Sequence, residues 1–402
     1  MKKPFIPDVL PIKDLDFTKL IKLVSEANQS LSRYGEILDG LSRFSNPSLF
    51  LANLATKEAV LSSRIEGTQA SYANLLQKDS KEYSERTKLD IEEIENCKKA
   101  LEFGIEDLKN RPLCLNLIRD IHSILLDGVR GCNKDRGDRG NFRKIQNFIG
   151  FAGAAMKEAS FIPPTPNEMN NALDNWEKYI HLESEEVLIQ LAVIHGQFEI
   201  IHPFLDGNGR IGRILIPLFL YSKQYLDFPA FYMSEYLESC RSEYYARLKN
   251  ISENKDWQGW IEFFLGAIIK QANINKNRII RIIKLYDKMI YIIPKISPSK
   301  YLPQIIEILF EKPILEVDDF LNKVPVSRST AIRILNGLSK PTKYEVKKTH
   351  YRDLFKESNL KSIERTAEPY LILEKNEGHG SKPSSYKFIE LFDIIESKVI
   401  FD

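Results

Sequence analysis

The stretch that most constrains the fold is HPFLDGNGRIGR, which begins at His202 and follows the apolar run VLIQLAVIHGQFEII. Pro203 disfavours helical backbone in the residue before it, so a helix carrying the apolar run should end at or before His202. Gly207 and Gly209 can adopt positive φ, and Asn208 tolerates it, which is turn chemistry. We therefore expect the next helix not to begin before Gly209. The sequence predicts two helices joined by a tight loop.

A loop that opens into a helix brings together free backbone N–H groups and the positive end of the helix dipole, which favours a bound anion. Arg210 and Arg213 stand one turn apart on the predicted helix, so both guanidinium groups can reach the same bound group. Asp206 is placed where a carboxylate can hold Mg²⁺ against phosphate oxygens. His202 can accept a proton near neutral pH. Together these residues indicate the transfer of a phosphate-containing group.

Composition limits the class of protein. The 402 residues exceed one ordinary hydrophobic core and predict two or three domains. Hydrophobic residues make up 43% and charged residues 28% of the chain, which is typical of a soluble globular protein. The 57 Lys and Arg against 55 Asp and Glu give a formal charge of +2, so any nucleic-acid contact must come from a local patch.

The cysteines and the N-terminus indicate a compartment. The cysteines are scattered without a CxxC pair, which argues against a disulfide framework or a zinc knuckle and favours a reducing environment. Prolines and aspartates interrupt the N-terminal stretch where a signal peptide needs an apolar core, and no run approaches the ~20 apolar residues of a membrane span. We therefore expect a cytoplasmic protein with no membrane partner. The four cysteines are Cys97, Cys114, Cys132 and Cys240.

Helical periodicity dominates to about residue 295, so the fold is predicted to be mainly α. Residues 1–110 should form an N-terminal helical region that includes a helix over about 47–67, and residues 111–295 should form the central core. A Gly-rich loop within that core contains one alternating stretch, RKIQNFIG, which predicts a short hairpin. The apolar stripe of NRIIRIIKLYDKMIYII is typical of a helix that joins domains or forms a homodimer.

Residues 296–402 predict a small separate domain. YLPQIIEILFEKP, EVDDFLNKV and SRSTAIRILNGLSK indicate three short helices, and YLILEK and SYKFIEL indicate two strands around a Gly-rich turn. This order is that of a winged helix-turn-helix domain, although some thirty residues after Lys340 separate the third helix from the first strand. Arg328 and Arg333 are the only basic residues at the start of the predicted recognition helix, so DNA binding and protein docking remain equally open.

HPFLDGNGRIGR resembles the signature of the Fic domain family, His-x-Phe-x-Asp/Glu-Gly-Asn-Gly-Arg-x-x-Arg, at every fixed position. The resemblance implies a Fic-type helical bundle with a β-hairpin flap over the nucleotide, and RKIQNFIG lies upstream where the flap belongs. Family members with an intact motif move AMP from ATP to a hydroxyl of a target protein. The resemblance therefore implies a Mg²⁺-dependent protein adenylyltransferase with ATP as its substrate and a protein, possibly itself, as its target.

The resemblance also implies roles for individual residues. His202 would deprotonate the target hydroxyl, Asp206 would hold Mg²⁺, Arg210 would contact the β-phosphate and Arg213 the γ-phosphate. Phe204 would anchor the loop in the core. The implied nucleotide neighbours in the flap, in the loop, on the following helix and on the adenine side are Asn147, Phe148, Ile149, Gly150, Gly207, Asn208, Gly209, Ile211, Gly212 and Tyr244.

A second motif, SSRIEG, resembles the inhibitory-helix pattern Ser/Thr-x-x-x-Glu-Gly/Asn that precedes some Fic cores. Ser62 and Glu66 are four residues apart on one helix face, and Gly67 should end the helix so that Glu66 lies near its tip. A carboxylate placed there can dock on Arg213 and compete with the γ-phosphate. We therefore expect autoinhibition by Glu66, which in some family members also supports removal of AMP.

Other interpretations stay open at this point. His195, Glu199 and His202 are spaced like a two-His-one-carboxylate metal site, although Pro203 displaces His202 and His195 is better explained as a hydrogen-bonded packing residue. His122 has no clustered partner in the sequence and is predicted to make surface or local contacts. The functional alternatives are transfer of another nucleotide monophosphate, phosphorylation, or a DNA-binding regulator whose core only senses nucleotide.

Overall fold

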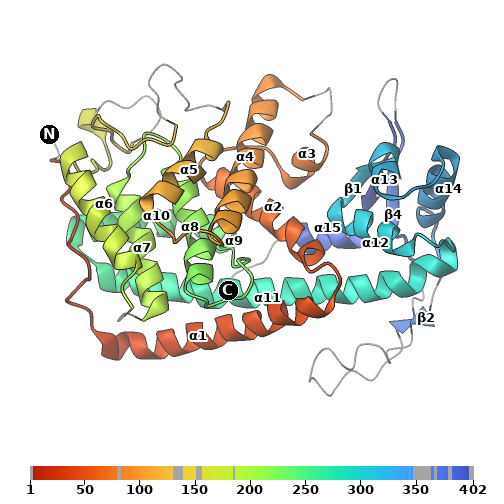
Figure 1. Ribbon diagram of the computed structural model, residues 1–402, viewed down its shortest axis with the longest axis horizontal. Helices are drawn as coiled ribbons and strands as arrows, with labels where there is room; N and C mark the ends of the chain where they lie inside the picture. The colour runs from red at the N-terminus through yellow and green to blue at the C-terminus, as the bar shows by residue number, and fades with distance from the viewer. Residues whose placement is uncertain are drawn as a thin grey trace.

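The computed structural model describes residues 3–78, 83–129, 139–150, 156–183, 186–343, 369–378 and 383–397, with the backbone of 345–346 and 364–365. These residues form a mainly helical molecule, as predicted (Figure 1). The helices before the C-terminal segment are α1 Phe17–Asp39, η1 Gly40–Arg43, α2 Ser48–Ile65, α3 Tyr72–Leu76, α4 Glu85–Asp107, α5 Leu115–Leu125, η3 Met156–Glu158, α6 Pro166–Ile180, α7 Val187–Ile201, α8 Asn208–Ser222, α9 Ser234–Ser239, α10 Arg241–Asn254 and α11 Trp257–Ile296.

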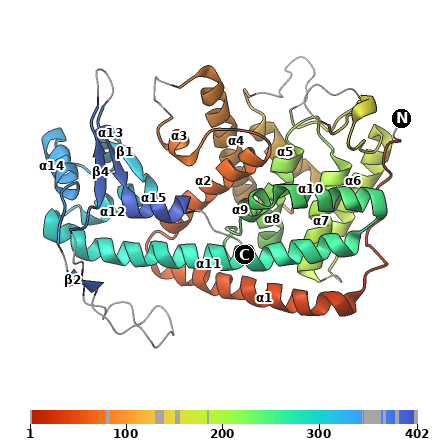
Figure 2. The same ribbon diagram turned by 180° about the vertical axis from the view of Figure 1, so that it is seen from behind.

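Two long helices run side by side along one edge of the molecule. Both views place α1 next to α11 over much of its length (Figures 1 and 2). The buried residues of α1 recur at helical spacing, with Leu20, Ala27, Leu31 and Leu38 on one face. The 40 residues of α11 reach from the core to the C-terminal segment, so this helix is shared by both parts of the chain.

At the centre lies α7, which is apolar on all sides and buried along almost its whole length. Side chains from neighbouring helices donate to its backbone, with the indole of Trp176 bonded to the carbonyl of Ile194 and that of Trp260 to the carbonyl of Ala192. A Cβ added at Gly196 would lie 2.7 Å from Nε1 of Trp260, so glycine is needed where α11 approaches α7. This packing fixes the end of α7, where the HPFLDGNGRIGR segment begins.

The C-terminal segment contains the three predicted helices and the two predicted strands, with a third strand that sequence reasoning missed. Its elements are α12 Leu302–Glu311, β1 Ile314–Glu316, α13 Val317–Lys323, α14 Arg328–Leu338, β4 Leu373–Asn376, β5 Ser385–Phe388 and α15 Ile389–Glu396. β5 lies between β1 and β4 and pairs antiparallel with both. The winged-helix assignment stays a prediction, and the insertion after Lys340 has only the short antiparallel pair β2 Glu345–Val346 and β3 Glu364–Arg365 within the described residues.

One predicted boundary is wrong, and another agrees with the structure. SYKFIEL is not a strand throughout, because the chain turns into α15 at Ile389, whose Leu391, Ile394 and Ile395 are buried at helical spacing. The helical periodicity that was predicted to end at about residue 295 does end at Ile296, where α11 stops after passing through Pro294. After the sheet, α15 packs against α2 and α11. Among the described residues, no helix is long and apolar enough to cross a membrane.

Candidate active site

A cavity of about 690 Å³ opens beside the junction of α7 and α8. One end is formed by Glu66, His202, Gly209 and Arg213, and the wall continues along α10 and the segment before α6. Its size suits a ligand as large as a nucleotide. The remaining lining residues are Phe148, Ile149, Gly150, Ser160, Phe161, Glu199, Ile200, Ser242, Tyr244, Tyr245, Ala246, Leu248, Lys249 and Ser252.

His202 is held at the end of α7 in a left-handed conformation with φ of 49°. Its Nδ1 lies 3.3 Å from the carbonyl oxygen of Glu199, and no described residue is hydrogen-bonded to Nε2. Burial lowers the pKa of His202 to about 4, so the ring is neutral at pH 7. If Nδ1 carries the proton and donates it to the Glu199 carbonyl, Nε2 is left as the acceptor that a general base needs.

Arg143 fixes the backbone on which His202 sits. Its Nε donates to the carbonyl of His202 at 3.0 Å, and its Nη2 donates to the carbonyls of Pro164 at 2.6 Å and Ile201 at 3.4 Å. The side chain is therefore a brace between the end of α7 and the chain that leads into α6. Sequence reasoning missed this role, because nothing near Arg143 in the sequence indicates a partner some sixty residues away.

The loop is tighter than predicted, because α8 begins at Asn208 instead of Gly209. Gly207 is the N-cap and takes the positive φ of 79°. Asn208 closes the loop through its side chain, which accepts from the N–H of Phe204 at 2.8 Å and donates to its carbonyl at 2.9 Å. Gly209 is helical and is needed for a different reason: a Cβ there would lie 2.2 Å from Oε1 of Glu66.

His122 contacts this loop through its buried side chain, so the prediction that it makes only surface or local contacts is wrong. Its ring is buried and stacked on Phe204 with centroids 3.7 Å apart. Nδ1 accepts from the N–H of Gly140 at 3.0 Å, which leaves Nε2 to donate to the carbonyl of Asp206 at 3.1 Å. The predicted core anchor, Phe204, is thus fully buried between the loop and α5, the helix that carries His122.

The predicted contact between Glu66 and Arg213 is present. Arg213 donates through Nε to Oγ of Ser62 at 2.9 Å, and through Nη2 to the carbonyl of Ser62 at 2.8 Å and to Oε1 of Glu66 at 2.7 Å. The Arg213 side chain is 1% exposed. Burial would raise the pKa of the Glu66 carboxyl, but the Arg213 guanidinium outweighs it and lowers that pKa. Gly67 ends α2 with φ of 103°, as the sequence indicated.

Arg210 and Asp206 are not among the residues that line the cavity, and Arg210 and Arg213 have different partners among the described residues. Arg210 is buried, with Nη2 3.5 Å from Oδ1 of Asp206 and Nη1 3.9 Å from Oε2 of Glu93. Its Nε and Nη1 have no hydrogen-bond partner among the described residues. The other predicted nucleotide neighbours that do not line the cavity are Asn147, Gly207, Asn208, Ile211 and Gly212.

Asp206 is the residue to test for Mg²⁺. Its side chain is 47% exposed, and Oδ1 accepts from the N–H of Gly207 at 2.5 Å, which leaves Oδ2 accessible. The described residues contain no group of three His, Cys, Asp or Glu side chains that could hold a metal ion. One exposed carboxylate fits Mg²⁺ that takes its other ligands from phosphate oxygens and water, and does not fit a dedicated protein cage.

The predicted flap is present only as a single bridge among the described residues. Ile149 pairs with Phe161, and its N–H donates to the Phe161 carbonyl at 2.9 Å. Phe148, Ile149 and Gly150 line the cavity, while the amide of Asn147 donates to the carbonyl of Phe204 at 3.2 Å. Residues 151–155, where a hairpin turn would lie, fall outside the described residues.

Three further residues line the cavity, Tyr244, Tyr245 and Glu199, and only Tyr244 was predicted to contact the nucleotide. Tyr244 is buried and its hydroxyl lies 2.9 Å from Nε2 of His195, whose Nδ1 is 3.0 Å from the Gly212 carbonyl. His195 is therefore the packing residue that was predicted. Tyr245, 41% exposed, and Glu199 line the cavity but were not predicted to bind a ligand there. Burial raises the pKa of Glu199 to about 8, so this carboxyl is protonated at pH 7.

Comparisons with known proteins agree with this geometry. The model of the Fic/DOC family matches residues 112–220, and the model of the Fic/DOC family N-terminal region matches residues 21–106. A probable protein adenylyltransferase of Aquifex aeolicus is 33% identical over 84 residues, which cover 21% of this chain and 26% of that protein. The protein adenylyltransferase Fic of Drosophila melanogaster is 30% identical over 160 residues, covering 39% and 28%.

The chain thus spans about a quarter of the length of the curated relatives it matches. A solved Fic family protein of Desulfovibrio desulfuricans G20 has a similar fold, with a TM-score of 0.53 and 16% identity over 96% of this chain and 98% of that one. The motif, the two family matches and the shared fold agree on one classification. Residues 112–220 of the chain are therefore assigned to the Fic/DOC family, and residues 21–106 to the N-terminal region of that family.

Proposed function

We propose that the chain is a protein adenylyltransferase, which transfers AMP from ATP to a Ser, Thr or Tyr hydroxyl of a protein. The observation that carries the proposal is the meeting of three groups at one end of the cavity: a neutral His202, the Arg213 guanidinium and the start of α8. The names of the similar proteins, which are adenylyltransferases, support the same reaction.

The step follows from the arrangement of these groups. The target hydroxyl oxygen attacks the α-phosphorus of ATP, its proton passes to Nε2 of His202, and the bond from the α-phosphorus to the bridging oxygen breaks to release pyrophosphate. The backbone N–H groups at the start of α8 bind phosphate oxygens, with the helix dipole favouring their charge. Asp206 would hold Mg²⁺, which supplies charge neutralisation to the phosphates when bound.

Glu66 restrains this reaction in the proposal. Its carboxylate accepts a hydrogen bond from Nη2 of Arg213, and a γ-phosphate bound to Arg213 would need the same guanidinium group. Gly209 lies directly beneath that carboxylate, so phosphate binding at the start of α8 and the docking of Glu66 compete for one space. Nucleotide can bind productively only after Glu66 withdraws from Arg213.

The test uses ATP labelled at the α or the γ position with three proteins: the full chain, Glu66→Gly, and Glu66→Gly with His202→Ala. We expect α-label on protein to rise at least tenfold in Glu66→Gly, since an ion pair that covers a cation costs ~1.4 kcal/mol or more to displace. The added His202→Ala change should abolish it, because the base is gone. Mass spectrometry should locate an adenylate on the chain itself or on an added protein.

Each other outcome rejects a part of the proposal. Label from the γ position alone would mean phosphorylation, and no protein label with ATP still bound would mean a core that only senses nucleotide. An unchanged rate in Glu66→Gly would reject the brake while leaving the transferase in place. Loss of α-label on prolonged incubation with native Glu66, but not with Glu66→Gly, would add AMP removal to the activity.

A further inference from the structure

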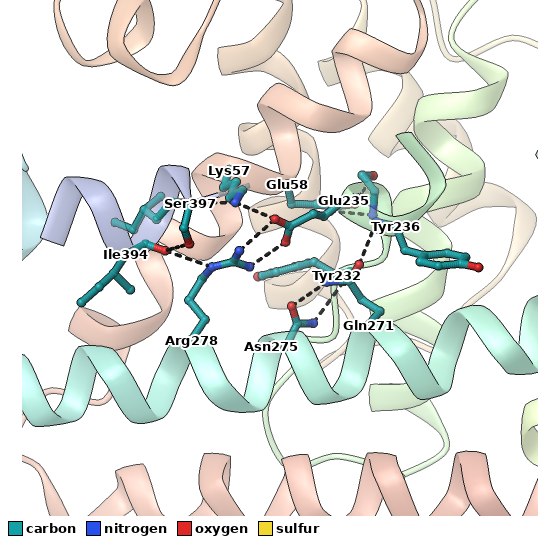
Figure 3. Close-up of polar contacts among 12 residues, drawn as sticks. Lys57, Glu58, Tyr232, Glu235, Tyr236, Gln271, Asn275, Arg278, Ile394 and Ser397 are labelled. Atoms are coloured by element: carbon teal, nitrogen blue, oxygen red, sulfur yellow. Dashed lines mark hydrogen bonds and ion pairs between the residues drawn. The ribbon is translucent and has the colours of Figure 1, made fainter. Parts of the chain in front are cut away.

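A buried charge cluster joins α2, the helix that carries Glu66, to two other helices (Figure 3). Lys57 of α2 donates to Oε1 of Glu235 on α9 at 2.8 Å. Arg278 of α11 donates to both oxygens of the same carboxylate, at 2.6 and 2.8 Å. The side chains of these residues are 9%, 12% and 4% exposed, so the cluster lies in the protein interior.

Helix α15 contributes negative charge and hydrogen-bond acceptors to this cluster. Burial and Arg278 lower the pKa of Lys57, whereas the carboxylates of Glu235 and of Glu396, the last residue of α15, raise it. Without α15, one carboxylate would face two cations in a poorly solvated place. The C-terminal end of α15 lies against that charge: Lys57 donates to the carbonyl of Ile395 at 2.5 Å and Arg278 to that of Ile394 at 3.3 Å (Figure 3). A helix C-terminus carries partial negative charge, which favours cations at this position.

A second contact links α2 to the C-terminal segment. The amide of Asn53, one turn before Lys57, donates to the carbonyl of Phe310 in the last turn of α12 at 2.5 Å. The hydroxyl of Tyr72 bonds to the Asn53 side chain at 2.7 Å, and its ring contacts Phe392 of α15 with centroids 5.9 Å apart. Helix α2 is therefore attached to the carboxyl ends of two different C-terminal helices.

The same helix reaches the active site on its other face. Glu58, Ser62 and Glu66 recur every four residues, and Ser62 and Glu66 bind Arg213. Glu58 accepts from the N–H and the hydroxyl of Ser234, the residue before Glu235, so α9 is bonded to both faces of α2. A shift of α2 that breaks the bonds of Lys57 should also move Glu66, because Glu66 is the C-cap of the helix that contains Lys57.

We propose that the C-terminal segment controls the Glu66 brake, with Lys57, Glu235 and Arg278 as the positioning residues through which α15 holds α2 against Arg213. Separation of α15 from α2, by a partner that binds the C-terminal segment, exposes the unbalanced cluster and releases Glu66 from Arg213. The contact itself stands on the structure alone, while its effect on catalysis rests on the proposed function.

The test is Lys57→Met in the full chain. Methionine keeps the length of the side chain and leaves Glu235 and Arg278 as a neutral pair, but it removes the donor to Ile395. We expect faster amide hydrogen exchange at residues 63–68. We also expect about tenfold more α-label from ATP on protein, because a tenfold change corresponds to the loss of one charge-assisted hydrogen bond. Arg64→Met is the matched control, since it removes one positive charge from the same helix outside the cluster; it should change neither readout.

A double variant that carries both Lys57→Met and Glu66→Gly distinguishes an effect through Glu66 from a general loss of structure. If Lys57 acts through Glu66, adding Lys57→Met to Glu66→Gly gives no further increase in AMP transfer. A further increase would overturn the proposal, as would unchanged exchange at residues 63–68 in Lys57→Met. Should Lys57→Met fail to fold, Asn53→Leu removes the α12 contact and carries the same expectations. If Glu66→Gly itself gives no α-label, the proposed function fails, and hydrogen exchange alone then decides whether the C-terminal segment holds α2.

Discussion

Arg213 is the residue on which the site depends, and its contacts were the part of the site that sequence reasoning predicted best. Ser62 and Glu66 could be placed because a four-residue spacing on a helix fixes a common face without knowledge of the fold. Gly67 marked the end of that helix, and its φ of 103° agrees. Arg213, the partner of Ser62 and Glu66, lies 147 residues away from Glu66, so the pairing itself was predicted from the resemblance to the inhibitory-helix pattern and not from local geometry.

The supporting residues could not be predicted in the same way. His122 and Arg143 act on the loop across 84 and 59 residues of sequence, and neither sits in a recognisable pattern. Tyr245 and Glu199 line the cavity because α10 and α7 meet there, which is a property of tertiary packing. Because His122 has no partner close to it in the sequence, surface or local contacts were predicted for it, and that prediction was wrong.

Glu199 predicts a pH dependence of stability. An unfolded glutamate titrates near ~4.3, whereas burial raises the pKa of Glu199 to about 8 in the folded chain. Between these values the folded chain keeps a proton that the unfolded chain has released, so the free energy of unfolding falls as the pH rises. Glu199→Gln cannot titrate, and it should avoid a loss on the order of 2 kcal/mol, a figure reduced because the cavity admits water.

Urea denaturation of the two proteins at pH 5 and pH 8.5 measures this difference. Glu243→Gln, an exposed change on the neighbouring α10, controls for the loss of one ionisable group. Parallel stability curves for wild type and Glu199→Gln over that range would show that Glu199 is ionised in the folded protein, contrary to this expectation.

At the scale of elements, α2 can approach α8 because residue 209 is glycine and has no Cβ atom. A Cβ at Gly209 would lie 2.2 Å from Oε1 of Glu66 and 3.0 Å from Nη1 of Arg213. Gly209→Ala should therefore push the Glu66 carboxylate off Arg213 and lower the free energy of unfolding by about 1–2 kcal/mol. In a Glu66→Gly background only the 3.0 Å contact with Nη1 of Arg213 remains, and alanine is favoured over glycine inside a helix by about 1 kcal/mol, so the cost of the same change should fall.

A double-mutant cycle in urea gives the coupling between positions 209 and 66. Gly266→Ala is the control, because Gly266 in α11 has nothing within 4 Å of the added methyl and should be unaffected by Glu66→Gly. Equal costs for Gly209→Ala in both backgrounds would mean that the methyl disturbs α8 itself instead of the contact with α2.

The elements themselves were predicted well where the apolar period was long, and poorly where a boundary depended on contacts. α2 and the three short helices of the C-terminal segment appear where the pattern placed them. The start of α8 was misplaced by one residue because Asn208 is held by its side-chain bonds to Phe204, which no propensity records. Ile389 begins α15 because its apolar neighbours pack against α2 and α11, so the strand pattern of SYKFIEL ended early.

At the scale of the whole molecule, the parts on the two sides of the predicted division at residues 295/296 pack against each other. α11 ends at Ile296 but packs against α12, α14 and α15, and α15 reaches the buried cluster around Glu235. Sequence reasoning could not foresee this contact, because the hydrogen-bond partners of Lys57 and Arg278 in α15 are backbone carbonyls, which leave no signal in residue type.

We therefore predict one cooperative unfolding transition. The three tryptophans all lie in α6 and the first turn of α11, so their fluorescence reports only the central core, whereas circular dichroism at 222 nm follows every helix. The two signals should give coincident denaturation curves in urea, because unfolding the C-terminal segment exposes the charged cluster of the core. A loss of helical signal at lower urea, before any change in fluorescence, would mean that the C-terminal segment unfolds independently.

The attachment of α2 at both ends also has a consequence for the direction of signalling. Thermodynamic linkage is reciprocal: whatever free energy α15 contributes to keeping Glu66 on Arg213, an occupant of Arg213 must take away from α15. A nucleotide bound in the cavity would then weaken the packing of α15 on α2. The concentration of ATP would therefore change the conformation of the C-terminal segment even when no AMP is transferred.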